Sequence, residues 1–287
     1  MERNRPCGGI TTEDNTMADK PDTGAMIGKD FWEKLAAESA AYCSADAAEQ
    51  ADPESAAALT VDMEQACLRG NVEKVIFCDE TAVLLKHRCG IYMLWARTAD
   101  AGRKAIGMLG SDDPLYHGMR CCVTHGKAAR DAVAAETKLY IEKPCIQFCR
   151  YSKEKLPLSG IGRVRELALF DLPVVLATYH KSTEEHLREA IEKGEMFGIE
   201  LDGELAAFVG MHQDGSVGML EVLPKFRRRG IGTELESYMH NMHIDRGWVP
   251  YGQVYTDNAA SLGMQAKFGL IKASEPVWWA YRTDIDF

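Results

Sequence analysis

The sequence predicts an α/β protein with a mixed sheet, divided into two domains, and three observations carry this prediction. The chain has 287 residues, which corresponds to roughly two domains of ordinary size. Segments with helical spacing of apolar residues alternate with short apolar runs typical of strands. A stretch containing Pro, Gly and Ser, at 153–162, follows the last cysteine. We therefore expect a polar leader at 1–27, a smaller first domain at 28–155 and a second domain at 160–287.

Composition narrows the classes of function. The formal net charge of -10 disfavours binding to nucleic acid or to an anionic membrane, because both need a basic face. No apolar run approaches the ~20 residues that cross a bilayer. The leader lacks the apolar core of a secretion signal, and Met17 and Met26 are alternative starts. Nine cysteines, an odd number, favour a reduced cytoplasmic protein over a disulfide scaffold.

The first half predicts helices followed by alternating strands and helices. Residues 29–70 indicate two or three helices, broken near Asp52-Pro53. The remaining pattern predicts strands at 74–77, 82–85, 91–94, 119–123 and 139–150, with helices at 99–109 and 127–135. No strong catalytic motif stands in this half.

The second half begins with clear helix signals. Residues 163–169 alternate as a strand, and Asp171 can then cap a helix with Pro173 in its first turn. Ser182 and Glu185 form a capping box for a second helix, which ends at Gly194.

The sequence then predicts two type I′ hairpin turns, at Asp202-Gly203 and Asp214-Gly215. They predict three antiparallel strands, at 196–201, 205–212 and 217–223. A helix ending at Arg246-Gly247 comes next, then a strand at 253–255, a helix at 258–268 and a strand at 277–281.

The junction between the strand at 217–223 and the next helix has the composition of an anion-binding turn. A helix amino terminus leaves N–H groups unpaired, and the helix dipole favours negative charge there. Gly230 and Gly232 allow a phosphate to approach the backbone closely. Arginines supply positive charge beside them on an otherwise acidic chain. The sequence therefore predicts a pyrophosphate site at 227–232.

This motif resembles the signature of the GNAT N-acetyltransferase superfamily, Arg/Gln-x-x-Gly-x-Gly/Ala, with Arg227, Gly230 and Gly232 at its fixed positions. The stretch from Asn258 to Leu270 resembles the second signature of the superfamily. The resemblance covers about 130 residues, from 160 to the end. Within the superfamily it looks closest to the glycine N-acyltransferase-like branch, in a two-part bacterial form with a degenerate amino-terminal half.

The resemblance implies a GNAT (acyl-CoA N-acyltransferase) fold for the second half, with acetyl-CoA as acyl donor. Backbone groups of two strand residues should pair with the pantetheine arm, the following turn should hold the pyrophosphate, and the Asn258 motif should lie near the thioester. The implied cofactor-binding residues are Val222, Leu223, Arg227, Arg228, Arg229, Gly230, Ile231, Gly232, Thr233, Asn258 and Ser261.

The catalytic positions depart from the pattern of the superfamily. Its frequent general-acid tyrosine falls at Gln265, and a frequent general base falls at Gln253, neither of which titrates. The alternative base position aligns with Ser216 or Gly218. Glu221 is the nearest carboxylate, but strand alternation puts it on the opposite face unless a bulge re-aims it. His212, Tyr255 and a water chain are further candidates for proton transfer.

Two other residue groups have simpler interpretations. Five residues of the first half lack the paired spacing of zinc knuckles, so we predict no metal site; they are Cys121, Cys122, His125, Cys145 and Cys149. Trp278 and Trp279 stand in the last strand, where alternation allows only one of them to face an acceptor pocket.

Three functional hypotheses follow. The first is an N-acetyltransferase that carries an acetyl or short acyl group to a small-molecule or peptide amine by direct attack, without a nucleic-acid or membrane partner. The second, motivated by Gln253 and Gln265, is an acyl-CoA-binding or sensory module with weak or no turnover. The third treats the first half as a partner-binding or dimerisation domain, and in the second case the protein would be a homodimer.

Overall fold

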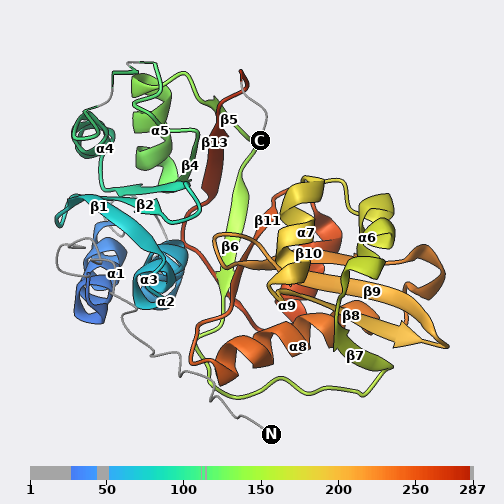
Figure 1. The fold of residues 1–287 in the computed structure, drawn as a ribbon. Coiled ribbons are helices and arrows are strands. Elements are labelled where there is room, and N and C mark those ends of the chain that lie inside the picture. Colours follow the sequence, from blue (N-terminus) through green and yellow to red (C-terminus); the bar gives the residue numbers. More distant parts are fainter. Residues whose placement is uncertain (1–26, 44–51, 111, 114, 285–287) are drawn as a thin grey trace, which may run out of the picture.

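The computed structural model describes residues 27–43, 52–110, 112, 113 and 115–284 (Figure 1). The expected leader at 1–27 lies outside them except for Ile27. The helices of the first half fall where the pattern predicted them, and Asp52 caps the second by accepting from the Glu54 N–H at 3.2 Å. Their bounds are α1 Lys29–Cys43, α2 Pro53–Leu59, α3 Val61–Leu68, α4 Ala99–Gly107 and α5 Gly126–Glu136.

A large mixed sheet lies between two layers of these helices. Its strand order is β1-β2-β3-β4-β13-β6-β11, with β12 beside β6 and β5 beside β13. Helices α1, α2 and α3 share one apolar core with it, and α4 and α5 share another on the opposite face. The strands from the first half are β1 Val72–Cys78, β2 Ala82–His87, β3 Tyr92–Ala96, β4 Cys121–His125, β5 Tyr140–Ile141 and β6 Cys145–Cys149.

A smaller antiparallel sheet, β10-β9-β8-β7, carries the second half. The three expected strands are confirmed as β8 Met196–Leu201, β9 Glu204–Met211 and β10 Val217–Val222, next to β7 Arg163–Glu166. The expected two-residue turn forms at Asp202-Gly203, where both residues have positive φ and Leu201 pairs with Glu204. The type I′ turn expected at Asp214-Gly215 is wrong: of these two residues only Gly215 has a positive φ, and the His212 N–H donates to the Ser216 carbonyl across a three-residue loop. Helices α6 Leu172–Thr178 and α7 Glu184–Glu192 cover one face of this sheet, and α8 Ile231–Asp245 covers the other (Figure 1).

The second half of the chain also contributes strands to the large sheet. The strands β11 Tyr251–Tyr255, β12 Ile271–Lys272 and β13 Val277–Tyr281 belong to the second half of the chain, yet they pair with β6, β4 and β5 of the first. The division into two domains at 155–160 remains a prediction. The large sheet contains hydrogen-bonded strands from both sides of this division. Helix α9, Ala259–Lys267, joins β11 to β12.

Both halves also repeat one order of elements. In the first half the order is β1-β2-β3-α4-β4-α5, and in the second it is β8-β9-β10-α8-β11-α9. In the first half, β3 and β4 pair in parallel along their length. In the second half, the corresponding strands β10 and β11 are not hydrogen-bonded neighbours among the described residues. An opening therefore lies between β10 and β11 in the second half, at the place where the first half has the pair β3 and β4.

Two helix starts in the second half differ from the sequence prediction. Helix α7 is capped by Thr183, which accepts from the His186 N–H at 3.3 Å, rather than by Ser182. Asp171 makes no cap, because its carboxylate accepts two bonds from Arg165, at 2.7 and 2.8 Å. The strand expected at 163–169 ends at Glu166, and the 3₁₀ turn η1, Leu169–Asp171, replaces its end.

The connection between the halves lies along α8 and is held by Glu234. Its Oε2 accepts from the Ser159 N–H and hydroxyl, at 2.7 and 2.6 Å, and its Oε1 accepts from the Gly160 N–H at 2.9 Å. Burial alone would raise the pKa of Glu234, but these three hydrogen bonds outweigh it and lower the pKa. The linker is thus fixed to the first turn of α8.

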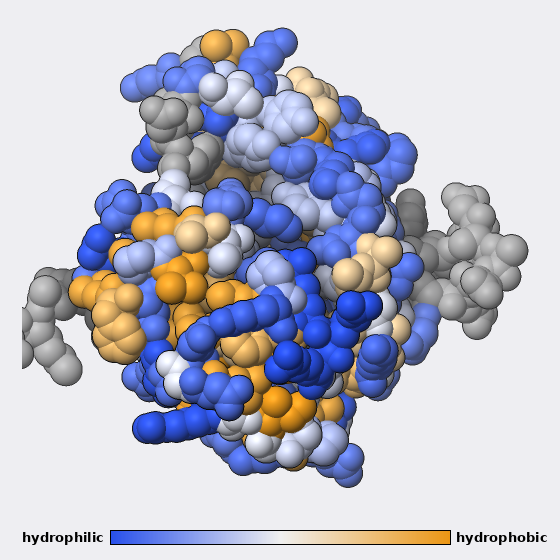
Figure 2. Space-filling view, turned by 90° about the vertical axis from the view of Figure 1, so that its right-hand side faces the viewer, coloured by the Kyte–Doolittle hydropathy of each residue, from blue (hydrophilic) through white to orange (hydrophobic). Residues whose placement is uncertain are grey.

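The side of the molecule in Figure 2 shows apolar side chains among hydrophilic ones. Leu169, Phe170 and Val174, in η1 and α6, are among the exposed large apolar residues. Among the described residues, no helix combines the length and the apolar composition needed to cross a bilayer.

Candidate functional site

A cleft of about 1380 Å³ opens where β10 and β11 separate, and both halves of the chain line it. The strands approach each other at one end, where a Cβ on Gly252 would lie 2.8 Å from the Val217 carbonyl oxygen. The start of α8 and α9 form one wall, and α7 with the segment before it forms another. The β2–β3 turn of the first half closes the far end, with His87 and Cys89.

A β-bulge shapes this edge of β10. Gly218 pairs with Gly210 of β9, and Glu221 pairs with Phe208, so three steps along β10 match two along β9. Met219, in the bulge, has a φ of 53°. Residues directly opposite one another in an antiparallel pair share a face, so Glu221 and Gly218 lie on one face. The bulge therefore places Glu221 on the same face as Gly218, whereas plain alternation would have placed it on the opposite face.

Three titratable side chains lie near this face. The ring of His212 lies over Gly218, where a Cβ would collide with it. Burial, assisted by Lys181, lowers the pKa of His212 against the opposing effect of Asp214, so the ring is neutral at pH 7. Burial, with Glu221 as a second cause, raises the pKa of Tyr179 to about 12. Burial likewise raises the pKa of Tyr255, in β11, to about 12.

The predicted anion-binding turn forms an open helix amino terminus. Gly230, at a φ of 81°, precedes α8, and no side chain caps the first turn of the helix. The N–H groups of Ile231, Gly232 and Thr233 consequently lack helical partners. Arg228 adopts a φ of 64°, which turns the chain toward the helix. This geometry suits a phosphate group.

The amino terminus of α4, the corresponding helix of the first half, is capped. Thr98 caps α4 by accepting from the Ala101 N–H at 3.2 Å. A Cβ on Gly102, near this end, would lie 2.6 Å from the Cβ of Ala132, so the glycine is needed for helix packing. Of the two repeated junctions, only the one before α8 is therefore built to receive an anion.

The three arginines of this turn differ in what they contact. Arg227 donates from Nε to the Val222 carbonyl at 2.9 Å and from Nη2 to Glu221 Oε1 at 3.0 Å. Arg228 and Arg229 are exposed, and the guanidinium of Arg229 lies 5.6 Å from the ring centroid of Phe226 in η2, Pro224–Phe226. Two arginines are therefore available to a ligand, and the third is engaged with β10.

Val222 and Leu223, the two residues expected to pair with pantetheine, differ in their backbone contacts. Leu223 donates its N–H to Ala206 of β9 at 2.9 Å, whereas the carbonyl of Val222 accepts from Arg227 Nε at 2.9 Å. Asn258 caps α9 by accepting from the Ser261 N–H at 3.2 Å, and both residues line the cleft. Their contacts with a coenzyme remain predictions.

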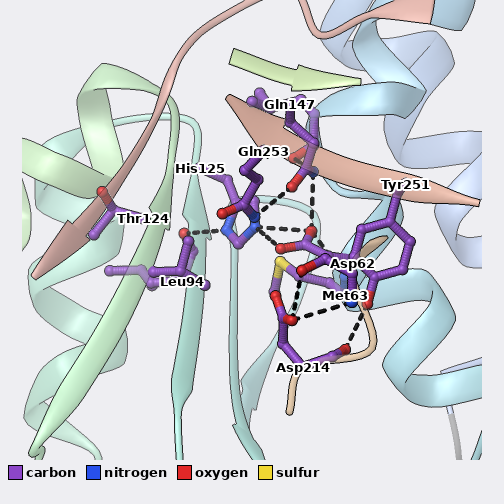
Figure 3. A network of polar contacts seen from close by, with 12 residues as sticks. Asp62, Met63, Leu94, Thr124, His125, Gln147, Asp214, Tyr251 and Gln253 are labelled. Atoms are coloured by element: carbon purple, nitrogen blue, oxygen red, sulfur yellow. Dashed lines mark hydrogen bonds and ion pairs between the residues drawn. The ribbon is translucent and has the colours of Figure 1, made fainter. Parts of the chain in front are cut away.

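Gln253 lies in the cleft wall, and its amide contacts Gln147 in the buried polar network of Figure 3. Its Nε2 donates to Gln147 Oε1 at 2.7 Å, and its Oε1 accepts from Trp279 Nε1 at 2.6 Å. Gln147 donates in turn to Asp62 Oδ1 at 3.1 Å, and His125 contacts the same buried carboxylate at 2.8 Å. Gln253 is therefore held in place by the core of the first half.

Gln265 is buried beside a carboxyl group that the motifs did not point to. Its Nε2 donates to Glu236 Oε1 at 3.1 Å, and both residues line the cleft. Glu236 stands one helical turn after Gly232 on α8, which places it on the same helix face. This i, i+4 spacing is the signal in the sequence that could have identified Glu236.

The cysteines considered for metal binding serve the core. Cys122, Cys145 and Cys149 are buried, and His125 is occupied by Asp62 and by the Leu94 carbonyl, at 3.0 Å. Within the described part of the chain, no group of three or more His, Cys, Asp or Glu residues is arranged to hold a metal ion.

Comparison with known proteins gives one family and a set of related folds. The family described as FR47-like protein matches residues 197–279. A GCN5-related N-acetyltransferase from Kribbella flavida superposes with a TM-score of 0.50 at 10% identity, covering 78% of this chain and 95% of that one. A Drosophila protein of known structure has a TM-score of 0.50 at 14% identity, covering 90% and 98%. No curated protein matches the sequence.

Proposed function

We propose that this chain, which has the fold of the GNAT superfamily, is an enzyme that transfers an acetyl or short acyl group from acyl-CoA to an amine. The observation that carries this proposal is the combination at one cleft: an uncapped, arginine-flanked helix start beside two separated strands. The first half repeats the order of elements without either feature, so the fold alone does not require them.

The residues present fit the diphosphate of a coenzyme A. The open N–H groups at the start of α8 and the exposed Arg228 and Arg229 are a donor set for phosphate oxygens. Gly232 has no Cβ, so a phosphate can approach its backbone N–H closely. Acyl-CoA bound there supplies an acyl group activated as a thioester.

The acceptor amine enters, in this proposal, from the face of the small sheet that carries Glu221. Glu221 accepts a proton from the amine, directly or through water. The neutral ring of His212 on the same face is the alternative base. Both halves line the entrance, and its charges are mixed: Glu189 and Glu195 lie there with Lys181 and Lys193. We propose a small-molecule or peptide amine as acceptor.

Isothermal titration of acetyl-CoA tests the binding half of this proposal. An Arg228→Ala/Arg229→Ala variant should bind at least tenfold more weakly than the wild type, equivalent to about 1.4 kcal/mol. Arg188→Ala, which removes an exposed arginine from α7, is the matched control and should bind as the wild type does. Absence of binding to the wild type would refute the proposal.

A binding module without turnover is the second candidate, and Gln253 favours it. The position of a frequent base carries an amide whose two ends are engaged in the core. Thiol release measured with a panel of amines separates the two functions. Release that depends on an amine and falls in Glu221→Gln supports the enzyme, whereas tight binding without release on any amine supports the module.

A further inference from the structure

Glu236 is a buried carboxyl group in the cleft with no part in the function proposed so far. Its side chain is 6% exposed, although one edge of the residue lines the cleft. Oε1 accepts from Gln265 Nε2 at 3.1 Å and lies 3.6 Å from His240 Nε2. Oε2 has no hydrogen bond to another described residue, so it is the oxygen left for a ligand.

Glu236 and Glu221 reach the gap between β10 and β11 from opposite faces of the small sheet. Glu221 shares a face with Phe208, which packs in the core beneath α6 and α7. Glu236 stands on α8, whose core residues pack against the other face, as Leu235 does. Two carboxyl groups therefore flank one opening, and a group transferred through the opening would pass between them.

A purely structural role explains this arrangement poorly. A Glu–His pair at i, i+4 on a helix surface contributes little stability, and here both side chains are nearly excluded from water. Burying such a pair is no more stabilising than apolar packing of the same volume. A buried carboxyl group with a specific partner in a cleft is instead a common feature of sites that transfer protons.

We infer that Glu236 is the catalytic acid of the transfer, and this inference rests on the proposed function. The amine nitrogen forms a bond with the acyl carbon, the carbon–sulfur bond breaks, and the sulfur leaves with the electron pair. Glu221 accepts the proton released by the amine, and Glu236 Oε2 gives a proton to the sulfur. Gln265 and His240 hold Oε1 and thereby aim Oε2. Return of one proton from Glu221 to Glu236 through water completes the cycle.

The test replaces Glu236 by Gln, which keeps the shape of the side chain and an oxygen for the Gln265 N–H. We expect kcat to fall about a hundredfold, the usual contribution of a positioned acid. The Kd for acetyl-CoA should stay within twofold. Glu184→Gln, the same substitution at an exposed residue of α7 that does not line the cleft, is the control and should keep kcat.

A second readout needs no turnover. The thiol of bound coenzyme A is titrated through the ultraviolet absorbance of its thiolate. A carboxylate facing the sulfur should hold the titration midpoint about one pH unit higher in the wild type than in Glu236→Gln. Glu236→Asp, which keeps the charge, should restore most of this difference, and Glu184→Gln should leave the wild-type midpoint unchanged.

The outcomes separate the two proposals. Equal midpoints in the wild type and Glu236→Gln, with coenzyme A bound to both, would show that Glu236 does not face the sulfur and would overturn this inference alone. A loss of kcat in Glu236→Gln without a shifted midpoint would also overturn it, because altered packing would then explain the loss. Absence of coenzyme A binding to the wild type would overturn the inference together with the proposed function.

Discussion

Arg227 and Arg229 have the same charge and lie two residues apart, yet the structure predicts different effects of removing them. Arg229 is exposed and available to a phosphate, whereas Arg227 holds the Val222 carbonyl at 2.9 Å and Glu221 at 3.0 Å. If the pantetheine arm takes the place of Arg227 on that carbonyl, Arg227 must first release it. Replacing each arginine by Ala therefore tests whether binding involves this exchange.

The expected magnitudes follow from these contacts. Releasing one backbone hydrogen bond and one partly exposed ion pair costs about 1–2 kcal/mol. Arg227→Ala removes this cost together with the attraction of its charge for phosphate, so the two changes largely cancel. We expect Arg227→Ala to bind acetyl-CoA within about threefold of the wild type. Arg229→Ala loses only attraction, and we expect its binding to weaken about tenfold.

Isothermal titration at two salt concentrations provides the measurement. Both variants remove one positive charge, so the long-range part of their effect should be screened equally by salt. The difference between them that persists at the higher salt reports the contacts of Arg227. Equal weakening by both substitutions would refute this reasoning, because Arg227 would then act as a simple phosphate ligand.

The remaining predictions concern stability and stoichiometry. Glu234→Gln should lower the free energy of unfolding by about 3 kcal/mol in urea, because it disrupts the bonds to the linker. Because the folded-state pKa of Glu234 is lowered, this loss should fade as the pH falls below about 4, and a pH-independent loss would contradict the ionic explanation. Asp62→Ala should cost about 3–5 kcal/mol by leaving His125 unpaired, and a cost below 1 would exclude a structural role for the pair. Gly162→Ala should lower the melting temperature more than Gly160→Ala, because both have positive φ but only Gly162 would place a Cβ 2.6 Å from a backbone oxygen. Titration should give one acetyl-CoA per chain, since α4 is capped; two per chain would show that the first half also binds it.

The sequence predicted those parts of the fold that depend on neighbouring residues. The turn at Asp202-Gly203 sets the register of its hairpin locally, and the strands on either side of it were located within one residue. Helix α8 follows from apolar spacing and ends, as expected, near Gly247. The fold class followed from the order of such elements.

Local patterns failed where side chains had competing partners. Asp171 was expected to cap α6, but its carboxylate binds Arg165, which a long-range contact brings close. Ser182 and Thr183 are both good caps, and the one-residue choice between them depends on how α7 packs. Positions of this kind cannot be predicted from spacing alone.

The site required knowledge of pairing between distant segments. The bulge at Met219 becomes visible only when β10 is aligned with β9, and it decides the face of Glu221. Gln253 was selected by its distance from Asn258 along the chain, but its amide is engaged by Gln147, 106 residues away. Glu236 belongs to no motif, and only the contact with Gln265 draws attention to it.

The opening between β10 and β11 is a product of both halves of the chain. Strand β11 pairs with β6 of the first half at every residue from Tyr251 to Tyr255, which fixes it in the large sheet. Strand β10 is fixed in the small sheet by β9, and its bulge strengthens the local twist. Neither strand can shift to close the gap without breaking its own ladder of hydrogen bonds. The first half thus contributes to the cleft by holding one of its two edges, although its own strands β3 and β4 are paired and its helix α4 is capped.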